Sequence, residues 1–419
     1  MKVEKKVPQI RFNGFSGEWN NLALDGNARF TKGQGYSKGD LVKNGSPIIL
    51  YGRLYTRYQT VIDGVDTFVN EKAKPLKSIG GEVIVPASGE SPEDISRASV
   101  VSEPNVILGG DLNVIYPNRK IDSVFLALTL SNGRLKKELS SKAQGKSVVH
   151  IRNSDLADLS LILPSEKEQT AIGNYFQKLD SLINQHQQKH DKLNNVKNAM
   201  LEKMFPKEGE TIPEIRFKEF SGVWKEIGLL ESIDRIIDFR GRTPKKLGLD
   251  WSHSGYRALS ALNVKQGYID FSIDPHFGDQ ELYDKWMSGS ELHQGQVLFT
   301  TEAPMGNVAQ VPNADKYILS QRTIAFVVKS EVVTEGFLAV LLRTSTVFRE
   351  LSALSSGGTA KGVSQKVLAN LNVFIPTDPI EQDAISKYFQ KIDTLINQHQ
   401  QQITKLNNIK QACLREMFV

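Results

Sequence analysis

A long segment occurs twice in this chain. Residues 168–205 and residues 381–418 align without a gap and are identical at 25 of 38 positions. Agreement of this extent indicates a duplicated structural unit rather than chance. The sequence VPQIRFNGFSGEW at 7–19 also returns, as IPEIRFKEFSGVW at 212–224. The chain must therefore fold as two related halves, each with the same order of shared segments.

The duplicated segments enclose two regions that differ. A weaker similarity joins residues 143–164 to residues 356–376, but residues 20–144 and 225–356 otherwise share little. Two nearly identical frames thus hold two unlike inserts. This arrangement is typical of a scaffold that holds two different recognition regions in symmetric positions.

The repeated long segment predicts a coiled-coil helix. Its apolar residues recur at alternating spacings of four and three, which is the pattern of a helix–helix seam. Ser165 and Glu168 predict a capping box at the first helix start. Asp378, Pro379 and Glu381 predict an N-cap, a first-turn proline and an N3 glutamate at the second. Each helix can run for about 37 residues, or about 55 Å. The predicted seam residues are Ile172, Phe176, Leu179, Ile183, Leu193, Met200, Ile385, Phe389, Ile392, Ile396, Ile403 and Leu406.

We expect the two helices to pack on each other in antiparallel orientation, with one insert at each end of the rod, because a whole domain of chain separates them. A duplicated core or an oligomerisation zipper would give the same repeat. His186, His190 and His399 lie on the predicted seam. A metal site there is disfavoured, since no carboxylate or cysteine converges with them and polar seam residues more often set the helix register.

Each insert predicts a mixed α/β module. Short apolar, β-branched runs bounded by turn residues indicate strands, and a longer periodic segment follows them in both inserts. A further apolar strand closes each insert. The predicted strands cover 45–51, 81–86, 105–108 and 159–163 in the first insert and 295–300, 322–328 and 371–375 in the second, and the predicted helices cover 122–141 and 334–354.

Loops of both inserts mix cationic and aromatic residues. Arg can fork onto guanine and Gln onto adenine, while Lys can hold phosphates. Most surface loops of this kind contact only water, but two of them in parallel positions of a duplicated frame favour nucleic-acid binding. The candidate residues are Arg53, Tyr55, Arg57 and Tyr58 in the first insert and Arg240, Arg242, Lys245, Lys246, Arg257, Gln321 and Arg322 in the second.

Composition limits the other possibilities. The net charge of +5 and the pI near 8.9 would help a polyanion to bind without requiring one. The single cysteine, Cys413, excludes an internal disulfide framework and a thiolate metal cluster, and fits a reducing cytoplasm. No apolar run is long enough for a bilayer, so we expect no membrane association. The common nucleotide-binding, hydrolase, deaminase and nuclease motifs are missing from the sequence, so we expect no catalytic residue, cofactor site or metal site.

The shared motifs resemble those of the specificity subunits of type I restriction-modification enzymes. The resemblance rests on FSGxW opening each half, on a Gly-x-Thr/Ser loop ending each insert, and on the helix pattern EQxAIxxYFxx[LI]DxLI after a proline. It covers essentially the whole chain, including its duplicated order. It implies two target recognition domains that each read one half of a bipartite sequence in double-stranded DNA, with the paired helices acting as a ruler.

The same resemblance implies partners and a division of labour. Two methyltransferase subunits would methylate adenine with S-adenosylmethionine, and restriction subunits would use ATP and Mg²⁺, while this chain binds none of these cofactors. The loops that match the family frame are expected to face DNA. They contain Gly145, Lys146 and Ser147 in the first half and Gly358, Thr359 and Lys361 in the second.

The expected fold is therefore mixed α/β, with two recognition domains and two long antiparallel coiled-coil helices. An adaptor whose inserts bind other proteins would share this architecture, but it would lack salt-dependent retention on duplex DNA. A complete restriction enzyme or methyltransferase is opposed by the missing motifs. The predicted segments are an N-terminal part of the frame (1–19), recognition domain 1 (20–163), spacer helix 1 (164–205), a linker with the repeated N-terminal segment (206–224), recognition domain 2 (225–375) and spacer helix 2 (376–419).

Overall fold

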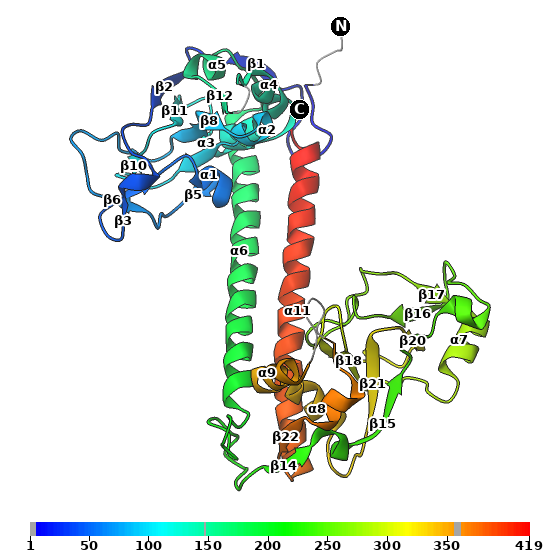
Figure 1. The fold of residues 1–419 in the computed structure, drawn as a ribbon. Coiled ribbons are helices and arrows are strands. Elements are labelled where there is room, and N and C mark those ends of the chain that lie inside the picture. The colour runs from blue at the N-terminus through cyan, green and yellow to red at the C-terminus, as the bar shows by residue number, and fades with distance from the viewer. Residues whose placement is uncertain (1–5, 146–147, 356–361) are drawn as a thin grey trace. The chain divides into compact units, whose positions relative to one another are not determined.

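The computed structural model describes residues 6–145, 148–355 and 362–419. Within these ranges the chain forms two compact units. The first unit contains the residues up to His186 together with Gln402–Val419, and the second contains Gln187–Gln401. Each unit combines one mixed α/β domain with part of both long helices, α6 (Glu166–Lys203) and α11 (Pro379–Glu416) (Figure 1).

The first unit contains short strands and short helices. Its strands are β1 (Asn20–Ala23), β2 (Ala28–Lys32), β3 (Leu41–Val42), β4 (Ser46–Ile49), β5 (Val61–Ile62), β6 (Phe68–Val69), β7 (Val83–Pro86), β8 (Ser88–Gly89), β9 (Ser99–Val101), β10 (Ile107–Leu108), β11 (Leu112–Pro117), β12 (Val149–His150) and β13 (Ser160–Leu163). Its helices are η1 (Lys38–Asp40), α1 (Arg53–Thr56), α2 (Pro92–Ile95), α3 (Ser123–Ser131), α4 (Gly133–Lys142) and α5 (Asn153–Ala157).

A five-stranded sheet in the order β2-β11-β7-β9-β5 forms the centre of the first unit. Strand β7 is buried along its whole length, as expected for an apolar central strand. Helix α3 packs on β7 and β9 and is buried from Phe125 to Ser131, because it is apolar on every side. A second sheet, β10-β4-β6-β3, and the pairs β1-β13 and β12-β8 complete the domain.

The second unit repeats this plan with different details. Its strands are β14 (Lys225–Gly228), β15 (Ile233–Asp238), β16 (Tyr256–Leu259), β17 (Phe277–Gly278), β18 (Val297–Thr300), β19 (Val308–Gln310), β20 (Tyr317–Leu319), β21 (Thr323–Val328) and β22 (Asn372–Ile375). Its helices are η2 (Leu229–Ser232), η3 (Pro244–Leu247), α7 (Gln280–Met287), α8 (Glu335–Leu341), α9 (Ser345–Leu354) and α10 (Gln365–Ala369).

The strand pairing shows which elements of the two units correspond. The sheet order β15-β21-β18 in the second unit matches β2-β11-β7 in the first, with antiparallel neighbours in both. The pair β14-β22 likewise matches β1-β13. A separate three-stranded sheet, β17-β16-β20, belongs to the second unit. The shared frame therefore folds alike in both units, while the inserted elements differ.

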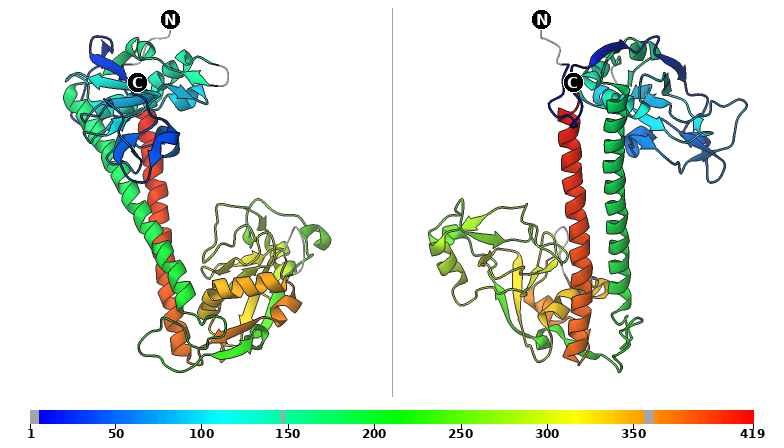
Figure 2. Two further views of the ribbon diagram at one scale, coloured as in Figure 1. Left: turned by 60° about the vertical axis from the view of Figure 1, so that its left-hand side comes forward. Right: turned by 180° about the vertical axis from the view of Figure 1, so that it is seen from behind.

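The long helices pack against each other in antiparallel orientation within each unit (Figures 1 and 2). In the first unit, Tyr175 of α6 contacts Cys413 of α11, and Asp180 of α6 contacts Lys410 of α11. Residue numbers therefore increase along α6 in the direction in which they decrease along α11. The predicted seam contains both buried and half-buried residues. Its buried members are Ile172, Phe176, Leu179, Ile385, Phe389, Ile392 and Ile403, and its half-buried members are Ile183, Leu193, Met200, Ile396 and Leu406.

The duplicated motifs form duplicated ion pairs. Arg11 of the first frame segment binds the carboxylate of Glu168 at the start of α6, with Nε–Oε1 and Nη2–Oε2 distances of 2.6 Å. Arg216 binds Glu381 at the start of α11 in the same way, with both distances 2.7 Å. Both carboxylates are almost fully buried. The capping box expected at Ser165 is therefore half made, since Ser165 Oγ accepts from the Glu168 N–H at 3.4 Å but the Glu168 carboxylate binds Arg11.

The glutamine after each of these glutamates ties the long helix to its domain. Gln169 Oε1 accepts a hydrogen bond from the N–H of Asp122, the N-cap residue of α3, at 2.9 Å. Gln382 Oε1 accepts from the N–H of Thr334, the N-cap residue of α8, at 2.7 Å. The repeated pair Glu-Gln thus fixes both a frame segment and a domain helix to the start of each long helix.

Aromatic side chains join the end of one long helix to the start of the other. In the first unit Phe418 lies with its ring centroid 5.7 Å from Phe125 and 5.9 Å from Phe176. In the second unit Phe205 takes the equivalent place, 5.7 Å from Phe337. Each domain core is therefore completed by both long helices, which explains why the repeated segment ends in phenylalanine.

Two predicted helices are each divided into two. The predicted helix at 122–141 consists of α3 and α4, which meet at Asn132 and at Gly133 with a φ of 62°. The predicted helix at 334–354 consists of α8 and α9, and Thr344 caps α9 by accepting from the N–H of Val347. Apolar residues occur on both sides of each break, so the apolar pattern does not reveal the breaks. The capping residues Asn132 and Thr344 are the local signals.

Candidate nucleic-acid interface

One end of the central sheet in the first unit is tied together by backbone hydrogen bonds. Ala87 follows β7, and its N–H donates to the carbonyl of Asp111, which precedes β11, at 2.7 Å. The carbonyl of Ala87 accepts from the N–H of Ile151 at 3.0 Å. Three separate stretches of chain therefore meet at this sheet end, and we call the arrangement the sheet-end junction.

The second unit has the same junction. Thr301 follows β18, and its N–H donates to the carbonyl of Arg322, which precedes β21, at 2.9 Å. The carbonyl of Thr301 accepts from the N–H of Val363 at 2.8 Å. Because these bonds match those of the first unit one by one, the positions Ala87 and Asp111 correspond to Thr301 and Arg322.

The strand register supports this correspondence. Pro86 pairs with Leu112 in the first unit, and Thr300 pairs with Thr323 in the second, directly beside the junction in both cases. The backbone conformation agrees as well. Asp111 has a φ of 58° and Arg322 a φ of 63°. Residues other than glycine seldom adopt this left-handed backbone conformation. Because it occurs at both positions, we take it as a constraint that the frame imposes in both units.

The side chains on the two junctions differ in charge and shape. In the first unit Lys32, Asp111, His150 and Arg152 line an open cavity of about 510 Å³, and all four are exposed. These are polar side chains from β2, from the turn before β11, and from the segment around β12. They can offer both hydrogen-bond donors and acceptors to a polar ligand.

In the second unit the junction carries two ion pairs. Arg322 Nε lies 3.1 Å from Glu302 Oε1, and both side chains are substantially exposed. Arg240 binds Asp238 at the end of β15 and donates from Nη1 to the carbonyl of Val363 at 3.1 Å. The hydrogen bond that Arg240 donates to Asp238 raises the pKa of Arg240 above its usual value. Arg240 thus helps to hold the junction together, whereas Arg322 extends from it.

Two candidate cations of the first insert, Arg53 and Arg57, share one carboxylate partner. Arg53 is largely buried and binds Asp66 at 2.9 Å and Gln59 at 2.8 Å. Arg57 is exposed and binds the same Asp66 carboxylate at 2.6 Å. This geometry makes Arg53 part of the domain's internal packing and leaves Arg57 as the accessible cation of the pair.

The two candidate tyrosines of that loop use their hydroxyl groups internally. Tyr55 donates to the carbonyl of Ser88 at 2.6 Å, and burial raises its pKa above the usual value. The Tyr58 hydroxyl lies 3.2 Å from the Ala98 carbonyl and from Ser131 Oγ, and burial raises its pKa as well. Their role in DNA binding stays a prediction.

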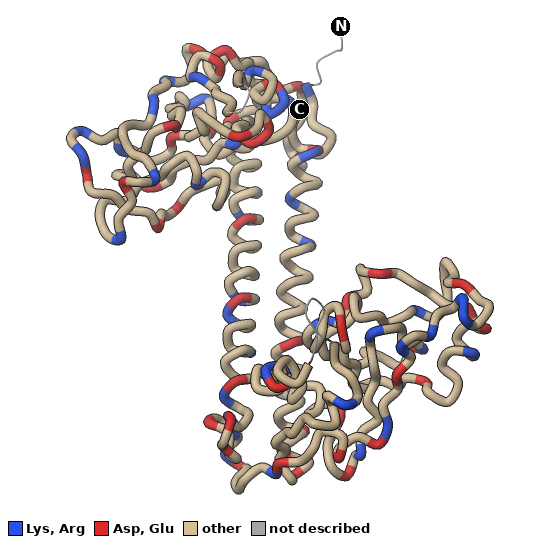
Figure 3. Tube along the Cα trace, in the orientation of Figure 1, with Lys and Arg blue, Asp and Glu red and all other residues tan. Residues whose placement is uncertain are grey.

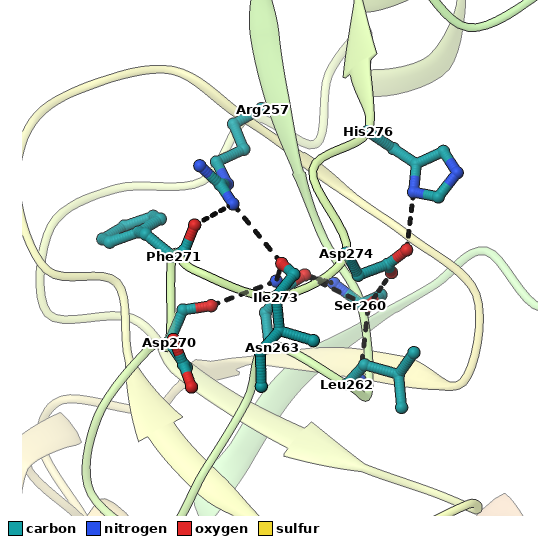
Figure 4. Close-up of polar contacts among 9 residues, drawn as sticks. All are labelled: Arg257, Ser260, Leu262, Asn263, Asp270, Phe271, Ile273, Asp274 and His276. Atoms are coloured by element: carbon teal, nitrogen blue, oxygen red, sulfur yellow. Dashed lines mark hydrogen bonds and ion pairs between the residues drawn. The ribbon is translucent and has the colours of Figure 1, made fainter. Parts of the chain in front are cut away.

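Arg257 organises a loop of the second domain (Figure 4). Its Nη2 group donates to the carbonyl of Phe271, and the guanidinium lies 5.1 Å from the centroid of the Phe271 ring. Asn263 and Asp274 bind Ser260 in the same network, with an Oγ–Oδ2 distance of 2.5 Å for Asp274. The position of Arg257 therefore matches a structural role in this loop more closely than a base contact.

The remaining candidates of the second insert are divided between packing and surface. Arg242 donates from Nη1 to the carbonyl of Trp286 at 2.5 Å and lies over the Phe239 ring. Gln321 donates its amide to the carbonyl of Arg242. Lys246 binds the carbonyl of Gly241 at 2.6 Å, and Lys245 is exposed. Lys146, Ser147, Gly358, Thr359 and Lys361 lie outside the described residues.

Sequence reasoning missed several residues of the junction, among them Lys32, Asp111, Arg152 and Glu302. Lys32 is the last residue of β2, and the other three lie within two residues of the end of a strand. This position at a strand end was the available signal. It could not be used without the strand pairing, because the two inserts cannot be aligned by sequence. Arg240 and Arg322 are predicted residues that lie at the junction, and Gln321, the residue before Arg322, binds the carbonyl of Arg242 beside it.

The charge pattern by itself does not mark a binding face. Figure 3 shows basic and acidic positions intermixed over both domains. Among the described residues, no group of three or more His, Cys, Asp or Glu side chains has an arrangement suited to a metal ion. No helix in the described ranges combines the length and apolarity that a bilayer crossing requires.

Two unlike domains on one duplicated frame define a modular protein built from a repeated unit. The family model described as the type I restriction modification DNA specificity domain matches residues 17–195 and 258–408, so the chain belongs to this family. The repeated match agrees with the duplicated frame.

Curated relatives carry the same description. The type I restriction enzyme MjaVIII specificity subunit of Methanocaldococcus jannaschii is 25% identical over 288 residues, which are 67% of this chain and 65% of the relative. The aligned part thus spans slightly less than two thirds of that relative. The putative type I restriction enzyme MjaX specificity subunit of the same organism is 25% identical over 362 residues, covering 81% of this chain and 80% of its own length.

A solved structure shares the fold. The crystal structure of the type I restriction-modification system S subunit from M. genitalium superposes with a TM-score of 0.62 at 14% identity, covering 99% of each chain. Because so little sequence is shared, this likeness concerns the fold alone. The predicted mixed α/β fold with long paired helices is confirmed by the structure and by this neighbour.

Proposed function

We propose that this chain reads a bipartite DNA sequence for a type I restriction-modification complex, with one domain reading each half of the target. The observation that carries this proposal is the sheet-end junction, which has the same backbone bonds in both units but unlike side chains. A constant frame with variable side chains is what two readers of different sequences require. Polar side chains at such a junction can contact base edges in the major groove, where each base pair presents a distinct pattern.

The roles of the other subunits are taken from the family. Two methyltransferase subunits would bind the duplicated frame and transfer the methyl group of S-adenosylmethionine to adenine, and restriction subunits would use ATP and Mg²⁺. This chain would supply recognition, and the whole complex would act in the cytoplasm. The number of residues in α6 and α11 would set the length of the non-specific gap between the half-sites.

Domain exchange tests the central claim. Residues 20–144 would be replaced by the corresponding insert of another family member, and the methylated motif would be mapped by sequencing DNA treated with the complex. We expect one half of the motif to change and the other to stay. If both halves change, the two domains do not read independently and the modular proposal fails.

Two further measurements separate the alternatives. Insertion of a whole heptad into both long helices should change the gap and leave both half-sites intact, whereas an unchanged gap would refute the role of helix length. Retention of the complex on duplex DNA should fall steeply with salt, because phosphate contacts release counterions. An adaptor that binds proteins would show no such dependence. The chain with S-adenosylmethionine and DNA but without partners should transfer no methyl group.

A further inference from the structure

The strongest specific feature of the second junction is the pair formed by Arg322 and Glu302. Arg322 immediately precedes β21, and Glu302 lies two residues after the end of β18, the neighbouring strand. The exposed fractions of their side chains are 56% and 42%, so both can reach a ligand. An exposed ion pair contributes little to stability, so stability alone does not account for this placement.

The backbone that carries Arg322 is fixed although its conformation is unfavourable. Its φ of 63° lies in the left-handed region, where a residue with a long side chain is uncommon. Its carbonyl accepts from the N–H of Thr301 at 2.9 Å and from Thr301 Oγ1 at 3.2 Å. The base of the side chain is therefore held rigidly, which lowers the entropy cost of ordering it on a ligand.

The ion pair also orients the guanidinium. Glu302 Oε1 faces Nε at 3.1 Å. The guanidinium is planar, so a carboxylate at Nε lies beside one edge of it, and the two terminal amino groups, Nη1 and Nη2, form its outer end. Those two groups have the spacing that forks onto O6 and N7 of guanine, which is the most common specific contact to DNA.

We infer that Arg322 reads a guanine in the half-site of the second domain, and that Glu302 is a positioning residue that aims its guanidinium. This inference rests on the proposed function and deepens it, since it names the base and the residue. Asp111 takes the corresponding position in the first domain, with a φ of 58°. A carboxylate there accepts from the amino group of cytosine and cannot fork onto guanine. The base that a side chain at this position can contact therefore differs between the two domains.

The test measures base preference at every position of the target. Purified complexes of the chain with its methyltransferase subunits would select from a library of DNA duplexes, for the wild type and for Arg322→Ala, Arg322→Lys and Glu302→Gln. We expect Arg322→Ala to weaken binding to the preferred target roughly 5- to 150-fold and to remove the preference for guanine at one position of one half-site. Arg322→Lys keeps the charge but cannot fork, so it should relax the same position.

Glu302→Gln gives a readout that a structural role would not produce. It should weaken the guanine preference at the Arg322 position and leave every other position unchanged. Lys285→Ala is the matched control, because Lys285 is an exposed cation of the same domain that pairs with Glu281 on one helix face. It should leave the selected motif unchanged.

Two outcomes would overturn the inference, and a third would overturn the proposed function. If Arg322→Ala weakens all sequences equally, Arg322 contacts phosphate, and the assignment to guanine is wrong while the proposed function stands. If the motif and the affinity of Arg322→Ala equal those of the wild type, the residue does not contact DNA. If the wild-type complex selects no motif, the proposed function itself has failed.

Discussion

The guanidinium of Arg11 binds both oxygens of the Glu168 carboxylate at 2.6 Å, and Glu168 is 1% exposed. This contact joins the first frame segment to the start of α6. The same pair recurs as Arg216 and Glu381 in the second unit. The arginine of the motif IRF and the glutamate of the motif EQ thus form one ion pair in each half, although the two motifs lie more than 150 residues apart.

Removal of either arginine should destabilise its own unit. Arg11→Ala leaves a buried carboxylate without its partner, which typically costs about 3–5 kcal/mol. Unfolding by urea, followed by circular dichroism, would measure this loss, and Arg216→Ala should give a loss of similar size. Arg57→Ala is a suitable control because Arg57 forms an exposed pair, for which about 0–1 kcal/mol is expected. A loss below 1 kcal/mol for Arg11→Ala would contradict the structural role of this contact.

A second ion pair links the long helices, and its two copies are unequal. Asp393 accepts from both Lys197 and Arg343 at 2.6 Å, and both cations are largely buried, whereas the equivalent Asp180 accepts from Lys410. Burial lowers the pKa of Lys197, and Asp393 opposes this shift. Asp393→Asn should therefore destabilise the chain by about 3 kcal/mol, because two buried cations lose their partner.

Asp180→Asn is the matched comparison in the other copy, and we expect a smaller loss from it. Both variants keep a side chain of the same size, so differences in packing are minimal. Chemical denaturation of the two proteins under one condition would compare them. Equal losses would show that Arg343 adds nothing to the pair.

A buried carboxylate in the first unit should make stability depend on pH. Glu82 is 1% exposed, and its Oε2 lies 3.3 Å from the N–H of Ile79. Burial raises the pKa of Glu82 above its usual value. Below pH 4.5 the group is protonated in both the folded and unfolded chains. As pH rises through the raised folded pKa, the cost of burying the charge appears, so the wild type loses stability.

Glu82→Gln removes this charge and can keep the hydrogen bond. The variant should melt at a higher temperature than the wild type at pH 7, and the difference should vanish near pH 4. Thermal melting at several pH values would measure it. A difference that does not change with pH would mean that packing, not charge, causes the effect.

The break between α3 and α4 depends on a glycine. Gly133 has a φ of 62°, and an added Cβ would lie 3.6 Å from the Cβ of Phe418. The added Cβ has enough space, so we expect Gly133→Ala to lower the free energy of unfolding only because alanine disfavours the left-handed conformation. This loss should be about 1–2 kcal/mol. Gly52→Ala is the control, since Gly52 has a φ of −59° and open space around it. That substitution should be neutral or slightly stabilising. Urea denaturation would measure the stability of both variants. If Gly133→Ala and Gly52→Ala are equally stable, the left-handed conformation of Gly133 has no energetic consequence.

Much of the frame could be predicted from sequence because it is duplicated and periodic. The spacing of apolar residues such as Phe176 and Phe389 predicts one apolar face on each long helix, and this prediction does not depend on the neighbouring domain. Side-chain roles in the inserts could not be predicted in the same way. Arg242 and Arg257 look like free cations in the sequence, but the fold places carbonyl groups and aromatic rings against them.

The sequence alone determined that the chain has two copies of one frame, that each copy ends in a long helix, and that the inserts differ. These properties are local, since they depend on residue order and spacing along a single segment. The tertiary structure decided which residues share a surface. Asp111 and Arg322 became equivalent through strand pairing and backbone hydrogen bonds, because a sheet joins stretches of chain that are distant in sequence, and no spacing rule connects them.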